Sequence, residues 1–343
     1  MDHILKELHS WCLQQLSLSP ADAANVLAVV SGDASFRRYY RLQLNDGGSV
    51  IAVHAPPDKE DNLAFATVQA LLHKHGARVP ALLGWDKPRG FLLQEDFGDQ
   101  LLLPLLVSSA AADHYYKQAF GVMLAMQRIP SEQHSLPAYD ETRLTTEMKL
   151  FPEWFVGGLL GYQLDSAERV MLDAVFSLLS QRALAQPQVL VHRDFHSRNL
   201  MVLADERLGM IDFQDAVVGP ISYDLVSLIR DCYISWPEEL VDDWISVYRR
   251  MAMQAGLLAG RSEAEFCQDV DWMGLQRHIK VLGIFARLNL RDGKSGYLAD
   301  LPLVLEYTLS IASRYPEFDE FLAWFDSKLM PLICQQSWFK DAD

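Results

Sequence analysis

The stretch 192-HRDFHSRNL-200 decides the fold of this chain. It places two histidines, two arginines, an aspartate and an asparagine within nine residues. Downstream, the short apolar segments 200-LMVL-203 and 208-LGMI-211 flank the polar turn 204-ADER-207, a pattern that predicts a β-hairpin. Antiparallel pairing brings the outer ends of a hairpin together, so Asn199 and Asp212 are expected to lie side by side.

An amide oxygen next to a carboxylate suits Mg²⁺, which takes few protein ligands and completes its shell with water and phosphate oxygens. Asp194 precedes Asn199 by five residues, in the loop after the predicted strand 189-VLVH-192. An aspartate, an asparagine five residues later and an aspartate after a hairpin follow one another in this order in kinases. The pattern predicts Asp194 as the catalytic base, and Asn199 and Asp212 as metal ligands.

The rest of the chain divides by its periodicity. Before residue 98 the patterns predict strands and few helices, whereas 111–185 and the part from 238 to the end are mostly helical. The turn 45-NDGG-48 favours a hairpin between the two strands that it joins. The expected elements of the N-terminal part are a helix at 3–16, strands at 25–30, 37–44, 49–55, 82–86 and 91–97, and a helix at 61–76.

These motifs resemble the small-molecule branch of the eukaryotic-kinase-like fold, the relatives of aminoglycoside phosphotransferases and choline kinases. The matching motifs, in order, are 94-QEDFGD-99, HRDFHSRN, 211-IDFQD-215 and 223-YDL-225. The resemblance implies an α+β, protein-kinase-like bilobal fold. Residues 1–97 are expected to form a small antiparallel sheet lobe with one main helix, and residues 98–343 a larger, mostly helical lobe with an embedded catalytic hairpin. It also implies ATP and Mg²⁺ as cofactors.

Two features depart from the kinase pattern. Kinases cover the phosphates with a glycine-rich loop and place a lysine on the third strand. Here 31-SGDASFRRYY-40 has one glycine, and His54 stands where the lysine is expected. Arg37, Arg38 and Lys59 are the alternative sources of the missing charge, with Glu60 or Asp61 to hold it. The predicted cofactor-binding residues are Ser31, Gly32, Ser35, Arg37, His54, Gln94, Glu95 and Asp96.

The acceptor is expected to be a small molecule. The segment 212-DFQDAVVGPISYDL-225 leads directly into a helical pattern and leaves no room for the activation segment of protein kinases. The segment 276-QRHIKVLGIFARLNLRDGK-294 carries five Lys or Arg and one acid. On a helix its cations at 277, 280, 287 and 291 fall within an arc of about 80°. This basic stripe predicts either a solvated face or recognition of an anionic acceptor.

A narrower resemblance rests on four segments that occur together. SGDASFRRYYRL, IAVHAPP, EMKLFPEWF and IKVLGIFARLNLRDGK resemble kinases that phosphorylate N-acetylmuramate and N-acetylglucosamine at the anomeric C1 hydroxyl in peptidoglycan recycling. The resemblance implies an amino-sugar acceptor and a sugar-1-phosphate uridylyltransferase as metabolic neighbour. The predicted substrate-binding residues are His196, Glu147, Arg287 and Arg291. Two alternatives stay open: an aminoglycoside, choline or amino-alcohol acceptor, and a pseudokinase without catalysis.

Other functional classes fit less well. His192, Asp194 and His196 alternate as in some metal-dependent hydrolases, but that alternative leaves Asn199 and Asp212 without a role. The net charge of −15 argues against nucleic-acid binding, and the longest apolar run, 101–112, is short and broken by proline. The four scattered cysteines and the absence of a signal-like N-terminus favour a cytoplasmic protein that does not bind membranes.

Overall fold

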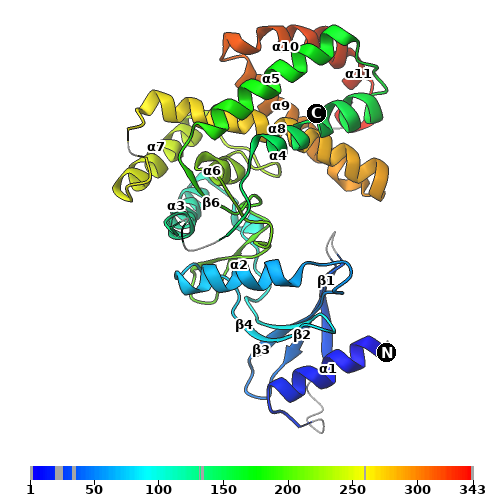
Figure 1. Ribbon diagram of the computed structural model, residues 1–343, viewed down its shortest axis with the longest axis vertical. Helices are drawn as coiled ribbons and strands as arrows, with labels where there is room; N and C mark the ends of the chain where they lie inside the picture. Colours follow the sequence, from blue (N-terminus) through cyan, green and yellow to red (C-terminus); the bar gives the residue numbers. More distant parts are fainter. Residues whose placement is uncertain are drawn as a thin grey trace. The chain divides into compact units, whose positions relative to one another are not determined.

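The computed structural model describes residues 3–19, 26–32, 36–130, 132, 135–258 and 260–340. The chain packs as two compact units (Figure 1). The first comprises Met1–Leu105 and Arg198–Ala216, and the second comprises Leu106–Ser197 and Val217–Asp343. The boundary predicted from the sequence, between residues 97 and 98, stays a prediction.

The first unit contains a five-stranded antiparallel sheet in the order β1-β2-β3-β5-β4. The turn between its second and third strands has the predicted chemistry: the Leu44 amide donates to the Gly48 carbonyl over 2.8 Å, and Gly47 has a φ of 86°. A positive φ is accessible to glycine at little cost. The strands are β1 (Leu27–Gly32), β2 (Arg38–Gln43), β3 (Ser49–His54), β4 (Leu82–Asp86) and β5 (Phe91–Glu95).

Two helices of this unit lie on opposite sides of the sheet (Figure 1). Helix α1 (His3–Gln15) buries Leu8 and Trp11 against strand residues such as Val50 and Phe91. Helix α2 (Asn62–Lys74) is capped at its N-terminus by Asp61, whose side chain accepts from the Ala64 amide over 2.9 Å. The predicted boundaries of both helices are therefore confirmed to within two residues.

The predicted hairpin is present as β7 (Leu200–Val202) and β8 (Leu208–Met210), with Leu200 opposite Met210. It packs within the first unit rather than among the helices of the second. The Leu102 amide donates to the Leu200 carbonyl over 2.8 Å, and the Met210 amide donates to the Arg78 carbonyl over 2.9 Å. A short η1 turn (Leu103–Leu105) follows this contact.

The second unit is helical apart from a two-stranded ladder, β6 (Gln188–Val191) with β9 (Val217–Pro220). Helix α8 runs through it and is buried along most of its length, so that it forms the centre of the core (Figure 1). Its Gly283 lies so close to Leu150 that a Cβ would come within 2.3 Å of the Leu150 carbonyl carbon. The helices are α3 (Ser109–Gln127), α4 (Glu141–Met148), the π-helix η3 (Phe151–Leu159), α5 (Ser166–Leu184), α6 (Ser222–Ile229), α7 (Glu238–Gln254), α8 (Glu263–Asp292), η4 (Ser295–Asp300), α9 (Leu301–Ala312), η5 (Pro316–Phe318), α10 (Asp319–Trp324), η6 (Phe325–Leu329), α11 (Met330–Ile333) and α12 (Ser337–Lys340).

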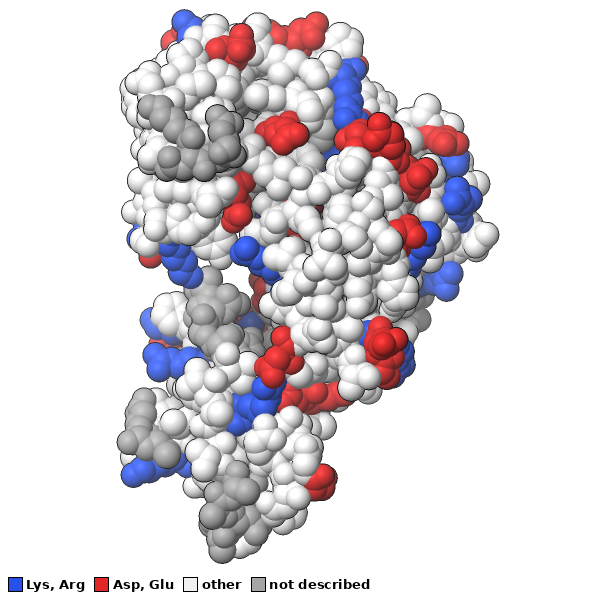
Figure 2. Space-filling view, turned by 180° about the vertical axis from the view of Figure 1, so that it is seen from behind, with Lys and Arg blue, Asp and Glu red and all other residues white. Residues whose placement is uncertain are grey.

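Acidic and basic side chains are interspersed on the face shown in Figure 2. Among the helices of the described ranges, none has both the length and the apolar character required to cross a membrane.

Candidate active site

The loop that follows β6 is held by Asp224, in the first turn of α6. Its carboxylate accepts from the His192 amide over 2.7 Å and from the Arg193 amide over 3.0 Å. Arg193 has a φ of 77°, a left-handed conformation that few non-glycine residues adopt. Burial raises the pKa of the fully buried Asp224 to about 7, although the two amide donors act in the opposite direction. Asp224 thus fixes an unfavourable backbone conformation next to Asp194.

The other end of the loop is held by a second buried aspartate. Asp231, which is 1% exposed, accepts from the Ser197 amide over 3.0 Å and from the Ser197 hydroxyl over 2.5 Å. No recognisable motif marks this residue in the sequence, because it belongs to a lone Arg-Asp pair and lies 34 residues after Ser197. Together the two aspartates anchor the segment 192–197 to α6 and to the residues that follow it.

Asp194 lies in the middle of this anchored segment and is partly buried. Its amide donates to Nδ1 of His192 over 3.3 Å. Burial acts to raise the pKa of Asp194, but the charges of Lys280, His196, His192 and Arg193 outweigh it and hold the pKa below its usual value. Asp194 is therefore ionised at neutral pH and can accept a hydrogen bond from a hydroxyl group.

Glu147, at the end of α4, binds three side chains around this loop. Its Oε2 lies 2.8 Å from the Lys280 ammonium and also accepts from the Tyr139 hydroxyl, and its Oε1 accepts from the Arg193 guanidinium. Lys280 donates in addition to the Tyr223 hydroxyl over 3.0 Å. Both oxygens of Glu147, which was predicted to contact substrate, thus have protein partners.

The predicted basic stripe of α8 divides into an inner and an outer part. Arg277 and Lys280 are 4% and 7% exposed, so the inner part belongs to the protein interior. Arg287 is half-buried, and among the described residues its Nε has no hydrogen-bond partner. Arg291 is exposed and pairs with Asp292 over 2.7 Å. Only the outer part is available to a ligand.

A run of aromatic rings leads away from the loop. The ring of the predicted substrate residue His196 meets Tyr233 edge-on at 5.5 Å. Tyr233 stacks on Phe285 of α8 with the ring centroids 6.4 Å apart. The ring centroids of Phe285 and Tyr297 are 5.1 Å apart. Tyr233 and Tyr297 are partly exposed. Rings of this kind suit the apolar face of a sugar.

The first unit holds a cavity of about 310 Å³ between its sheet and the hairpin. Its walls are largely apolar, and Asn199 and Asp212 are among the polar residues that line it. The lining residues are Val30, Tyr39, Ile51, Phe65, Pro80, Gln94, Glu95, Asp96, Phe97, Gly98, Asp99, Leu101, Asn199, Met201, Ile211, Asp212, Phe213 and Gln214.

Asn199 and Asp212 lie side by side, as the hairpin pattern predicted. Asn199 Nδ2 is 3.5 Å from Asp212 Oδ2, and Gln214 Nε2 donates to Asp212 Oδ1 over 2.7 Å. Asp212 itself has a φ of 65°. In the part of the chain that the structure describes, no group of three or more His, Cys, Asp and Glu residues forms a metal cage. Two oxygen donors beside an open cavity fit Mg²⁺, which keeps water and phosphate ligands.

Three predicted nucleotide contacts, Gln94, Glu95 and Asp96, line this cavity, but two of them also hold the backbone in place. Glu95 pairs with Arg78 over 2.5 Å. Asp96 accepts from Arg41 over 2.5 Å and from Ser49 over 2.6 Å. The two carboxylates therefore stabilise the segment after β5.

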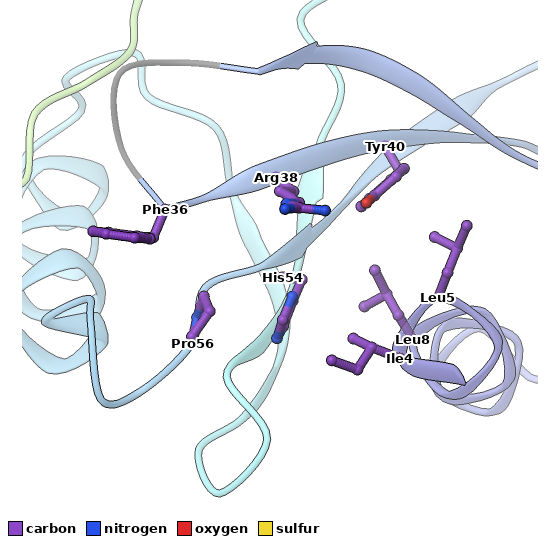
Figure 3. A pocket seen from close by; sticks show the side chains of 8 residues that line it. All are labelled: Ile4, Leu5, Leu8, Phe36, Arg38, Tyr40, His54 and Pro56. Carbon is purple, nitrogen blue, oxygen red and sulfur yellow. The ribbon is translucent and has the colours of Figure 1, made fainter. Parts of the chain in front are cut away.

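The structure does not bring His54 to this cavity. His54 lies instead with Arg38 and Tyr40 on the side of the sheet that faces α1, as Figure 3 shows, where they line a separate cavity of about 260 Å³. Strand alternation explains the difference, because Ile51 lines the cavity between sheet and hairpin, and residues three apart on a strand face opposite sides.

Arg37 is the predicted cation that the structure places near the cavity between sheet and hairpin. It is 4% exposed, pairs with Glu60 over 3.4 Å and lies over the ring of Phe65 at 5.2 Å. Phe65 stacks in turn on Phe213 at 5.0 Å, next to Asp212. Ser31 and Gly32 belong to β1, and Ser35 lies outside the described residues.

Residues 26–263 match the model of a family described as the phosphotransferase enzyme family. The chain belongs to this family. It is 40% identical over 322 residues to the N-acetylmuramate/N-acetylglucosamine kinase of Pseudomonas putida, covering 92% of this chain and 94% of that protein. It is 42% identical over 294 residues to the enzyme of the same name from Neisseria meningitidis serogroup B, covering 85% and 87%.

Solved structures share the fold at low sequence identity. Plasmodium vivax ethanolamine kinase has a TM-score of 0.64 at 11% identity and covers 91% of this chain and 90% of its own. Choline kinase LicA from Streptococcus pneumoniae has a TM-score of 0.61 at 13% identity, with 90% and 100% covered. The protein-kinase-like fold expected from the sequence is confirmed. The chain is a phosphotransferase that acts on a hydroxyl acceptor.

Proposed function

We propose that this phosphotransferase uses ATP and Mg²⁺ to phosphorylate the C1 hydroxyl of N-acetylmuramate and N-acetylglucosamine, in peptidoglycan recycling. The observation that carries the proposal is the identity of about 40% with relatives of that name over most of both chains.

Asp194 is the proposed base of the reaction. Its carboxylate accepts the hydrogen bond of the acceptor hydroxyl, and takes the proton as the oxygen bonds to the transferred phosphorus. ADP leaves with the electrons of the broken phosphorus–oxygen bond. Asp224 and Asp231 hold the loop, so little reorganisation is needed when the acceptor binds.

Asn199 and Asp212 are the proposed metal ligands. Mg²⁺, when bound, neutralises negative charge on the nucleotide phosphates. The two side chains lie next to one another at the end of the hairpin, with Asn199 Nδ2 3.5 Å from Asp212 Oδ2, and Gln214 fixes the orientation of Asp212. The proposal gives the cavity between sheet and hairpin to the nucleotide, with the backbone of residues 94–98 contacting the base. Arg37, held by Glu60, takes the place of the third-strand lysine.

The proposed acceptor site follows the aromatic run and the outer cations of α8. The rings of Tyr233 and Tyr297 pack against the sugar. Arg287, a half-buried cation of this outer part, binds the lactyl carboxylate that N-acetylmuramate has and N-acetylglucosamine lacks. The product, a sugar 1-phosphate, is then the substrate of a uridylyltransferase.

The test is ADP release by the purified protein with Mg²⁺ and ATP, with N-acetylmuramate, N-acetylglucosamine, kanamycin or choline as acceptor. The proposal predicts release with both sugars, accompanied by an equal loss of reducing ends. Release with kanamycin or choline alone contradicts the proposed acceptor. Release with a sugar whose reducing end persists contradicts the C1 position.

The variant Arg287→Met tests the carboxylate contact separately. It is expected to lower kcat/KM for N-acetylmuramate about tenfold or more and to leave N-acetylglucosamine within twofold, since a charged hydrogen bond contributes about 1.5 to 3 kcal/mol. An equal loss for both sugars rules out a specific contact with the lactyl group.

A further inference from the structure

Lys280 is a buried lysine in the middle of α8, far from both ends of this thirty-residue helix. Lysine is seldom buried unless it is paired. Its ammonium lies 2.8 Å from Glu147 Oε2 and 3.0 Å from the Tyr223 hydroxyl. These partners come from α4 and α6, so three helices meet at one charge.

The same cluster reaches the loop of Asp194 by two routes. Glu147 binds Lys280 with one oxygen and Arg193, the neighbour of Asp194, with the other. Tyr223 is followed directly by Asp224, which accepts the amides of His192 and Arg193. A displacement of Lys280 therefore changes both supports of the loop.

We propose that Lys280 is a positioning residue of the active site, whose positive charge, fixed by Glu147 and Tyr223, orients and electrostatically supports Asp194 from a separate helix. The inference rests on the proposed role of Asp194 as the base. It assigns a task to the inner part of the basic stripe, which the proposed acceptor contacts leave unused.

The charges around Asp194 support this assignment. Lys280 from α8 is the strongest of the charges that lower the pKa of Asp194, followed by His196, His192 and Arg193 of its own loop. Glu147 from α4 carries the opposite sign, and Asp224 from α6, whose pKa is raised to about 7, does so only when it is ionised.

Lys280 itself stays charged. Burial acts to lower its pKa, but Tyr223 and Glu147 outweigh burial and hold the pKa above its usual value. A permanently charged ammonium on a rigid helix keeps Asp194 ionised, whereas histidines supply charge only when they are protonated.

The experiment compares Lys280→Met, Lys280→Arg and wild type, with Lys328→Met as the matched control. Lys328 is an exposed lysine of the same unit on the π-helix η6. The first readout is the pH dependence of kcat/KM for the sugar. The second needs no activity: the ¹³C resonance of the Asp194 carboxyl is followed through a pH titration, with Asp194→Asn to assign it.

Removal of the charge in Lys280→Met is expected to raise the pKa of Asp194 by about one unit or more, and to move the acid limb of kcat/KM by the same amount. Loss of kcat at pH 7 is expected to be roughly tenfold or more. Lys280→Arg is expected to return the acid limb of kcat/KM most of the way to its wild-type pH, and Lys328→Met to leave the limb at that pH. KM for ATP is expected to stay within twofold of wild type in all variants.

The proposal is overturned if a folded Lys280→Met protein shows the wild-type acid limb of kcat/KM and the wild-type titration of the Asp194 carboxyl resonance. This holds whatever the loss of rate. If Lys280→Met does not fold, the same comparison with Lys280→Gln decides. A shifted Asp194 resonance in a protein that phosphorylates no sugar leaves the role of Lys280 standing and removes the proposed acceptor instead.

Discussion

The variant Asp224→Ala tests whether the loop of Asp194 depends on one buried carboxylate. The substitution leaves the buried His192 amide and the partly buried Arg193 amide without acceptors, and each such loss costs about 1 to 3 kcal/mol. Relief from burying a carboxylate, which raises the pKa of Asp224 to about 7, offsets part of this cost. The expected loss of unfolding free energy is therefore near the lower end of the sum, about 2 to 3 kcal/mol. Asp224→Asn keeps one acceptor oxygen and is expected to lose about half as much.

Urea unfolding gives the change in free energy, and hydrogen exchange of a peptide spanning 190–197 reports the two amides directly. Asp224→Ala is expected to lose their protection and most of the kcat, because Arg193 no longer keeps its left-handed backbone. Asp243→Asn, an exposed aspartate on α7, serves as the control. An unfolding free energy within about 0.5 kcal/mol of wild type, together with protected amides, shows that the loop does not depend on Asp224.

Three further predictions concern pH and the cavity between sheet and hairpin, where the nucleotide is proposed to bind. Gly209→Ala places a Cβ 2.4 Å from the Phe97 ring, and is expected to destabilise the protein by about 1 to 3 kcal/mol and raise KM for ATP; an unchanged KM contradicts it. Arg37→Met is expected to raise KM for ATP about tenfold, and His54→Ala is expected to raise it less than twofold. A larger increase with His54→Ala than with Arg37→Met rules out Arg37 as the cation that takes the place of the third-strand lysine. The raised pKa of Asp224 means that the folded protein takes up a proton, so its contribution to stability falls as pH rises from about 4 to 7. The urea midpoints of wild type and Asp224→Asn should therefore converge or cross as pH rises through that range. Midpoints that stay a constant distance apart contradict the raised pKa of Asp224.

The proximity of Asn199 and Asp212 was predictable because their geometry is local. Two short apolar segments around a polar turn allow one pairing, and that pairing puts Asn199 beside Asp212. The hairpin at residues 45–48 was predictable for the same reason, since Gly47 occupies the one position that needs a positive φ.

His54 lies at the expected place of the third-strand lysine, but its side chain is on the other face of the sheet. The expected place of the third-strand lysine was read from the order of residues, but the face of a strand changes with every residue. The register of β3 against β5 pairs His54 with Phe91, whose ring it meets at 5.7 Å on the side of α1. The strand was therefore predicted correctly, whereas the direction of one side chain was not.

The cluster around Glu147 was not predictable from local patterns. Helical spacing places Lys280 and Arg287 on one arc of α8, but only the surrounding helices determine which part of the arc is buried. The partners of Lys280 come from positions 147 and 223, and the periodicity of α8 contains no information about them.

The ³¹P NMR spectrum of the product formed from N-acetylmuramate and ATP by the wild-type protein, with Asp194→Asn as the control, tests the proposed reaction at the transferred phosphorus. A new sugar phosphate resonance that is coupled to the anomeric proton is expected for the wild type, and no such resonance for Asp194→Asn. A product resonance coupled to a proton at another carbon contradicts the C1 assignment. The same C1 product formed at the wild-type rate by Asp194→Asn contradicts the proposed base.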